Sequence, residues 1–213
     1  MSGYEGPYLT PGSVSGSVIT EGAIAGRELA DRYDDLRVSL TAVSRGGVRD
    51  PDFVKIRDNG AGSTGVYAYA FDSSSDEELF FETQMPHDWL TGSTIYWHIH
   101  WTPGSAGVAQ DGKSVRWGLE YTLSDNIGSA IPTTTIITVT DTVVGTDYAG
   151  QITSDVAIDM TGYDTSCVFM CRVFRDTSVA DNATADMIGL STDFHYLRDG
   201  NGTLNHTYPF GGQ

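Results

Sequence analysis

The sequence predicts an all-β fold, an antiparallel β-sandwich or jelly roll, and three observations lead to it. In segments such as 94–101, TIYWHIHW, and 115–124, VRWGLEYTLS, apolar and polar residues alternate, as they do in strands with one buried face. About ten such segments follow one another without helical patterns between them, which favours a sandwich over a mixed fold. Clusters of Asp, Asn and Gly separate them, for example DNG at 58–60 and DGNG at 199–202, and such clusters form turns.

The strands follow in chain order, each indicated by alternation or by a run of β-branched and aromatic residues. They are expected at 36–43, 52–56, 66–71, 79–85, 94–101, 115–124, 134–142, 151–158, 167–174 and 187–197. The strands at 94–101 and 115–124 are expected to be neighbours, because a loop containing Pro and Gly joins them. Residues 27–35, RELADRYDD, are expected to form a short helix.

Composition divides the chain into three parts. Residues 1–34 are rich in Gly and Ser and lack sustained periodicity, so they are expected to form an extended or disordered N-terminal arm. Residues 35–197 are expected to form the jelly-roll β-sandwich, and a chain of this length can build such a core without disulfides. Residues 198–213 are expected to form a polar C-terminal tail.

The charge and hydropathy of the chain argue against several classes of partner. The sequence has 12 Lys and Arg against 28 Asp and Glu, a net charge of −16, and such a field repels a nucleic-acid backbone. No apolar run reaches the ~20 residues of a membrane span, and the N-terminus lacks the basic and apolar regions of a signal peptide. We therefore expect no nucleic-acid partner, no membrane partner, and assembly in the cytoplasm.

The two cysteines, Cys167 and Cys171, lie four residues apart in a predicted strand. Four residues of strand span about 13 Å, whereas a disulfide needs Cα atoms within about 7 Å. Both are expected to be unpaired core residues.

His98 and His100 are the strongest candidates for chemistry. Positions two apart on a strand lie about 6.6 Å apart on one face, so both imidazoles could bind one ion. Glu120, expected on a neighbouring strand, could add a carboxylate. His195 and Asp193, which share a face of the last predicted strand, could join them as metal ligands. Such a set suits a transition metal, as in the cupin enzymes, but the glutamate that cupins place after the second His is absent. The prediction is a hydrogen-bonded polar sheet face with no metal and no cofactor.

No catalytic motif accompanies these histidines. The nucleophile elbow, the phosphate-binding loop and the dinucleotide-binding glycines are all missing, so we assign no catalytic residue and expect no enzyme. The acidic segment 72–78, DSSSDEE, lacks the spacing of a calcium loop and is expected to be solvated. Trp97, Trp101 and Trp117 share the apolar faces of their strands, which predicts a place in the core rather than on a sugar-binding surface.

Five segments carry a resemblance to known proteins. They are 65–72, GVYAYAFD; 77–89, EELFFETQMPHDW; 98–103, HIHWTP; 115–122, VRWGLEYT; and 193–196, DFHY. Together they resemble a family of small tailed-bacteriophage virion proteins. The resemblance implies a non-enzymatic jelly-roll structural protein of the virion, with no catalytic residues to carry over.

The expected function is capsid decoration. A cement protein of this kind would lie on the capsid surface of the virion, bind and stabilise the shell of major capsid protein, and form a homotrimer. Its arm would dock by ordering on a neighbour's sheet, through Tyr4, Tyr8, Leu9, Val18, Ile19, Ile24 and Leu29. The alternatives are a carbohydrate-binding tail, fibre or head-fibre module with exposed aromatics on loops such as 89–91 or 148–151, and a cupin-like metal-binding protein.

Overall fold

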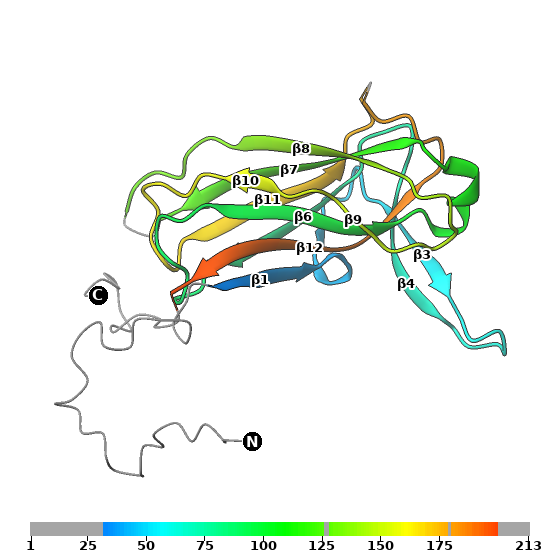
Figure 1. Ribbon diagram of the computed structural model, residues 1–213, viewed down its shortest axis with the longest axis horizontal. Coiled ribbons are helices and arrows are strands. Elements are labelled where there is room, and N and C mark those ends of the chain that lie inside the picture. Colours follow the sequence, from blue (N-terminus) through cyan, green and yellow to red (C-terminus); the bar gives the residue numbers. More distant parts are fainter. Residues whose placement is uncertain (1–31, 126–127, 179, 200–213) are drawn as a thin grey trace, which may run out of the picture.

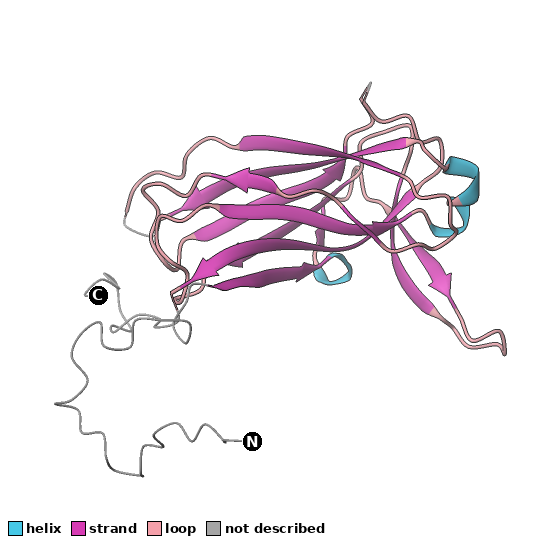
Figure 2. Ribbon diagram, viewed as in Figure 1, coloured by secondary structure: helices cyan, strands magenta, loops and turns pink. Residues whose placement is uncertain are grey.

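The computed structural model describes residues 32–125, 128–178 and 180–199, which form two antiparallel sheets packed face to face (Figure 1). Sheet A contains β1 (Arg32–Ser39), β3 (Asp52–Arg57), β4 (Val66–Phe71), β6 (Ile95–Thr102), β9 (Gln151–Ile152), β10 (Val156–Ile158) and β12 (Met187–Arg198). Sheet B contains β2 (Ser44–Arg45), β5 (Glu78–Gln84), β7 (Ser114–Ser124), β8 (Thr135–Thr142) and β11 (Val168–Arg175). Within these described residues, helix is confined to short 3₁₀ turns, η1 (Leu40–Ala42), η2 (Gly104–Ala106) and η3 (Val108–Gln110) (Figure 2). The predicted all-β antiparallel jelly-roll sandwich is confirmed.

The order of strands makes β12 the centre of sheet A. Sheet A runs β10–β6–β12–β4–β3, with β9 also on β6 and β1 also on β12, and sheet B runs β2–β5–β11–β7–β8. One edge of β12 pairs with β6, while the other pairs first with β4, at 187–189, and then with β1, at 191–198. Because β1 takes over this edge, the β3–β4 hairpin extends away from the body of the sandwich (Figure 1).

Large aromatic side chains fill the space between the sheets. Trp97 and Trp101 of β6 and Trp117 of β7 are fully buried, as the alternation predicts. The rings of Trp101 and Trp117 lie 6.3 Å apart across the core, and Phe71 of β4 meets the Trp117 ring edge-on at 5.2 Å. Trp89, between β5 and β6, is fully buried as well.

Most predicted strands begin and end within one residue of their observed bounds, and 66–71 matches β4 at both ends. Two predictions differ. The strand expected at 36–43 is observed four residues earlier, as β1, with 40–42 in η1. The segment expected at 151–158 divides into β9 and β10. Thr153 lies between β9 and β10. Its hydroxyl accepts a hydrogen bond from the Ile99 N–H of β6 at 3.1 Å, and this bond holds the interruption between the two strands against β6.

Two predictions about neighbouring elements are wrong. A helix was expected at 27–35, but its described residues, 32–35, belong to β1. Residues 32–34, expected in the N-terminal arm, are therefore part of the sandwich. Pairing with β12 along the whole of β1 outweighs a weak local preference for helix. The strands β6 and β7 are not neighbours either, since they lie in opposite sheets and the chain crosses between them through η2 and η3.

Both cysteines are buried and free, as predicted. Burial is the main reason that the pKa of the Cys167 thiol rises to about 12, and it also raises the pKa of Cys171. Among the described residues, no helix is long and apolar enough to span a membrane.

Candidate functional site

A group of titratable side chains lies on the outer face of sheet A, and we call it the histidine–aspartate cluster. Alternation along β6 turns its tryptophans into the core and its histidines outward. The register then places His98 opposite Asp193 of β12, and Asp193 opposite Arg37 of β1. The cluster consists of His98, His100, Asp193, His195, Asp155, Asp35 and Arg37.

Three atoms converge at the centre of the cluster. The Nε2 atoms of His98 and His100 lie 3.2 Å apart, and they lie 3.5 Å and 3.1 Å from Oδ2 of Asp193. The side chains of His98 and Asp193 are each only 1% exposed, while that of His100 is 36% exposed. The convergence is thus buried on one side and reaches solvent through His100.

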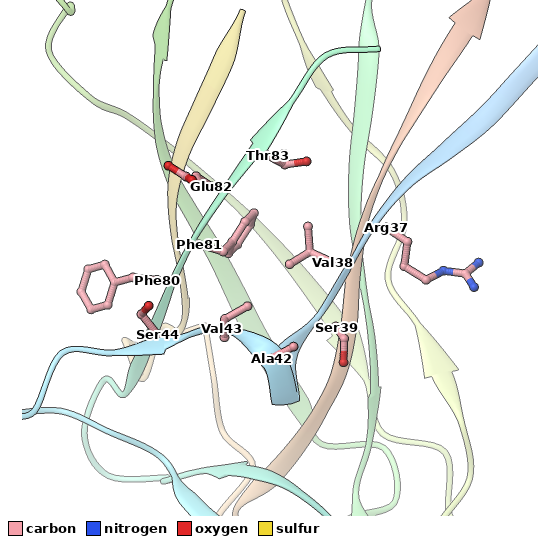
Figure 3. Close-up of a pocket in the computed structure, with 10 residues that line it drawn as sticks. All are labelled: Arg37, Val38, Ser39, Ala42, Val43, Ser44, Phe80, Phe81, Glu82 and Thr83. Carbon is pink, nitrogen blue, oxygen red and sulfur yellow. The ribbon is translucent and has the colours of Figure 1, made fainter. Parts of the chain in front are cut away.

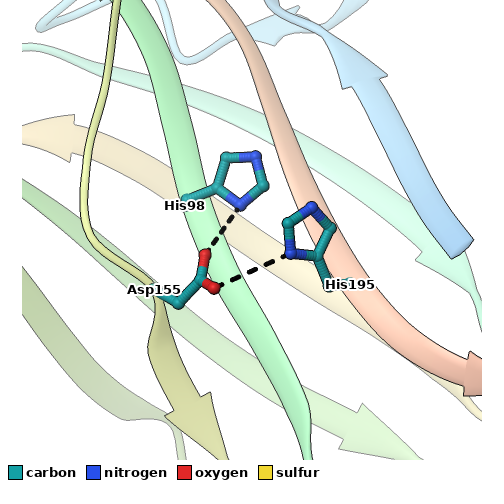
Figure 4. Close-up of side chains that lie close together, drawn as sticks. All are labelled: His98, Asp155 and His195. Carbon is teal, nitrogen blue, oxygen red and sulfur yellow. Dashed lines mark ion pairs between the residues drawn. The ribbon is translucent and has the colours of Figure 1, made fainter. Parts of the chain in front are cut away.

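Asp155, from the segment between β9 and β10, joins two histidines on the other side of His98 (Figure 4). Its Oδ1 lies 3.2 Å from Nδ1 of His98, and its Oδ2 lies 3.8 Å from Nδ1 of His195. The second ring nitrogen of His195 pairs with Asp35 of β1 at 3.1 Å. A shallow pocket of about 250 Å³ opens here, lined by Tyr33, Tyr96, Asp155 and His195.

Charges within the cluster shift the pKa values of His98 and Asp193. Burial lowers the pKa of His98, but the hydrogen bond and charge of Asp193, with the charge of Asp155, outweigh it, and the pKa is raised. Burial raises the pKa of Asp193, but the hydrogen bond from His98 and the charges of His100, His98 and Arg37 outweigh it, and the pKa is lowered. The cluster therefore favours a carboxylate at its centre despite its burial.

Glu120 does not take part in the cluster, which corrects its prediction as a candidate metal ligand. Its strand, β7, belongs to sheet B, so its polar face lies on the opposite outer surface of the sandwich. There Arg172 bridges Glu120 at 2.8 Å and Glu78 at 2.6 Å. His195 does belong to the cluster, but its described ion pairs are with Asp35 and Asp155.

Asp155 and Asp35 are the carboxylates of the cluster that the sequence did not indicate, whereas Asp193 was a candidate together with His195. The signal for Asp193 was present in the sequence, because it lies two residues before His195 and shares its face. No comparable signal existed for Asp155, because the turn between β9 and β10 brings it there.

Three aromatic residues form a second feature, which we call the aromatic shelf: Phe53 of β3 with Tyr67 and Tyr69 of β4. The Phe53 ring stacks on that of Tyr67 at 5.4 Å and lies 5.0 Å from that of Tyr69. Phe53 is 52% and Tyr67 37% exposed, because their hairpin extends beyond the sandwich (Figure 1). Alternation identified these strands but could not show that their aromatic face is left uncovered.

The loops expected to carry exposed aromatics do not form open platforms. At 89–91, the Trp89 ring is buried and its indole N–H donates to the Ser93 hydroxyl at 2.9 Å. At 148–151, the guanidinium of Arg57 covers the Tyr148 ring, 3.6 Å from its centroid. Exposed aromatic surface lies instead on the hairpin and at Tyr33 of β1, which is 59% exposed.

A third feature is the edge groove, a hollow of about 390 Å³ between β1 of sheet A and β5 of sheet B (Figure 3). Val38, Val43 and Phe81 point into it (Figure 3). Among the described residues, the outer edge of β1 pairs with no strand, and that of β5 pairs only with the two residues of β2. The arm residues expected to bind a partner lie outside the described residues: Tyr4, Tyr8, Leu9, Val18, Ile19, Ile24 and Leu29.

Comparison with known proteins gives similarities to solved structures alone. No family model and no curated protein matches this sequence. A Paenibacillus sp. cycloisomaltooligosaccharide glucanotransferase complexed with cycloisomaltoheptaose aligns with 73% of this chain, which spans 17% of that enzyme, at 12% identity and a TM-score of 0.42. TmCBM61 in complex with β-1,4-galactotriose (78% of this chain, 86% of the other) gives 17% identity and a TM-score of 0.34. A family 35 carbohydrate-binding module from an environmental isolate (78% and 93%) gives 13% identity and a TM-score of 0.37. At such values we transfer neither residues nor ligands from these structures.

Proposed function

We propose that this chain is a non-catalytic jelly-roll module that binds a carbohydrate on the aromatic shelf. One observation carries the proposal: Phe53 and Tyr67 present stacked, exposed rings on a hairpin that extends past the sandwich. An exposed group of large apolar side chains usually marks a binding surface. The flat face of an aromatic ring carries partial negative charge, and it therefore attracts the C–H groups on the face of a sugar ring.

Polar groups beside the rings supply partners for sugar hydroxyls. Tyr67 and Tyr69 carry phenolic groups that donate and accept hydrogen bonds. Lys55, which pairs with Tyr67 across the hairpin, has a side chain that is 46% exposed. A few polar groups around an apolar surface are the usual composition of a small-molecule site.

The test is binding of the full-length protein to an array of bacterial surface polysaccharides, followed by titration of each positive glycan. Phe53→Ala and Tyr67→Ala should each weaken binding about tenfold, which corresponds to ~1.4 kcal/mol. Val108→Ala is the control, because Val108 is 68% exposed and lies in η3, outside the shelf. A glycan that binds equally well to wild type and to both shelf variants would refute the shelf as the site, and no binding to any glycan would refute the proposal.

The setting that we propose is the virion of a tailed bacteriophage, as the sequence resemblance implies, with this chain as a tail, fibre or head-fibre module. In that setting, a polysaccharide of the host surface is the ligand class of interest. Immunogold labelling of particles with antibody against the protein would locate it, and absence from purified particles would contradict the setting.

Capsid decoration is the second candidate, and the edge groove favours it. The groove lies between two sheet edges that are free over most of their described length, and free edges accept an added strand from a partner. We propose the N-terminal arm of a second copy as the strand, within a homotrimer on the shell of major capsid protein. The arm joins the sandwich at Arg32, the first residue of β1, the strand whose outer edge pairs with no described strand.

A charge placed in the groove tests this candidate. Ala42→Arg, in the groove wall, should shift trimer to monomer in sedimentation velocity and lower occupancy on capsids that lack the native protein. Val48→Arg is the control, because Val48 is 90% exposed and lies outside the groove. Equal assembly and occupancy of the two variants would contradict a role for the groove.

A further inference from the structure

We propose that His98, His100 and Asp193 bind one divalent first-row transition metal ion. The site lies on the outer face of sheet A, and the argument does not depend on the aromatic shelf or on the function proposed above. It starts from the convergence of three ligand atoms, two imidazole Nε2 atoms and one carboxylate Oδ2.

The spacing of these atoms fits coordination to a single ion. An ion about 2.0–2.2 Å from nitrogen and oxygen ligands, with angles of about 90–109° between them, separates those ligands by about 2.8–3.6 Å. The observed separations are 3.2 Å between the two histidine nitrogens, 3.1 Å from His100 to Asp193 and 3.5 Å from His98 to Asp193. All three fall inside this interval, so small movements of the side chains suffice to bind the ion.

The hydrogen-bonding capacity of the site also points to a cation. A neutral imidazole that carries its proton on Nδ1 has only a lone pair at Nε2. Few protons are therefore available for hydrogen bonds among the two Nε2 atoms and Oδ2 of Asp193. Oδ1 of Asp193 is buried and accepts no hydrogen bond from any described residue. A buried carboxylate with an unused oxygen is costly unless a positive charge lies beside it. Arg37 supplies part of that charge at 3.5 Å from Oδ2, and a metal ion would supply the rest at the point where the lone pairs meet.

Asp155 sets the protonation that metal binding needs. Its carboxylate lies 3.2 Å from Nδ1 of His98, a charge contact without hydrogen-bond geometry. The negative charge favours a proton on that nitrogen, which leaves the Nε2 lone pair directed at the site. A carboxylate behind a ligating histidine is the usual arrangement in metal sites. Figure 4 shows Asp155 on the side of His98 that faces His195.

Arg37 is the group that opposes a cation here. Its Nε lies 3.5 Å from Oδ2 of Asp193, but its side chain is 63% exposed. It also pairs with Asp35 at 3.4 Å, so it keeps a partner when it moves away from Asp193. The guanidinium therefore competes with the metal, and its removal should tighten metal binding.

The ligand set selects the class of ion. Calcium and magnesium prefer oxygen ligands alone, whereas imidazole with a carboxylate suits zinc, iron(II), cobalt and their neighbours. His100 is partly exposed, which gives the ion a route from solvent and leaves coordination positions for water. We therefore choose Zn²⁺ as the binding probe and Co²⁺ as the spectroscopic probe.

The experiment uses tag-free, full-length protein treated with EDTA and then dialysed. Calorimetric titration with Zn²⁺ should show one ion per chain and a higher Tm, and Co²⁺ should give visible absorption bands that Zn²⁺ removes. His100→Ala should weaken Zn²⁺ binding by about 10- to 100-fold, and Arg37→Gln should strengthen it. His87→Gln is the matched control, because His87 lies outside the cluster, beside Ser166, and it should bind as wild type does.

The outcomes separate the proposal from its rivals. Absence of Zn²⁺ and Co²⁺ binding to wild type would overturn it, as would equal binding by wild type and His100→Ala. Circular dichroism shows whether each variant is folded; if His100→Ala fails to fold, tighter binding by Arg37→Gln supports the proposal and unchanged binding refutes it. Glycan binding should survive EDTA, so failure of one proposal leaves the other testable.

Discussion

Arg175 holds one end of the sandwich together through a fully buried guanidinium, and its replacement is the most informative test of the fold. The side chain is 0% exposed. It donates to both carboxylate oxygens of Asp181, at 2.8 and 2.9 Å, and to the carbonyls of Phe71, Ala183 and Ala185, at 3.1, 2.8 and 2.8 Å. All five N–H donors of a guanidinium are therefore used.

Arg175→Met removes these bonds while keeping an unbranched apolar side chain. The Asp181 carboxylate, 2% exposed, then loses its cation and keeps, among the described residues, only the backbone N–H groups of Arg116 and Ala183. Breaking a buried ion pair by removing one partner costs about 3–5 kcal/mol. For a chain of this size, that loss lowers Tm by roughly 6–20 °C.

The measurement is urea denaturation followed by tryptophan fluorescence, with Arg175→Met, Asp181→Leu and the double variant. The double variant should cost less than the sum of the two single variants, because neither partner is then left buried and alone. Lys55→Met is the control, since its ion pair with Asp58 is exposed, and it should leave the midpoint unchanged. A loss below about 1 kcal/mol for Arg175→Met, the size of an exposed pair, would refute the buried-clamp reasoning.

Two further predictions test the core. Trp117→Ala should lower the free energy of unfolding by about 3–5 kcal/mol, because the Trp117 ring is fully buried between Trp101 and Phe71. A denaturation midpoint equal to that of wild type would contradict that packing. The thiols of Cys167 and Cys171 should not react with Ellman's reagent at pH 8 until the protein unfolds, because burial raises both pKa values, that of Cys167 to about 12. Stoichiometric labelling of the native protein would contradict their burial.

Part of the histidine–aspartate cluster could be predicted from the local sequence pattern. Alternation along 94–101 predicts that His98 and His100 share the polar face of one strand, and it does so because the side-chain period of a strand is two. The same period on 187–197 places Asp193 with His195. The sequence could not choose between Glu120 and Asp193 as the third ligand, because that choice depends on which strands pair. The structure pairs β6 with β12, the strand that carries Asp193.

By itself, the sequence determined most of the strands, their inward and outward faces, the all-β class and the buried, unpaired state of both cysteines, because these follow from local periodicity and chain geometry. Only the tertiary structure decided that β1 pairs with β12 rather than forming part of a helix, that β6 and β7 face each other across the core, and that Asp155 reaches His98. It also decided that the face of Phe53 and Tyr67 stays exposed. These outcomes depend on contacts between residues far apart in the chain. The contribution of such contacts to the free energy of folding cannot be read from any local stretch of sequence.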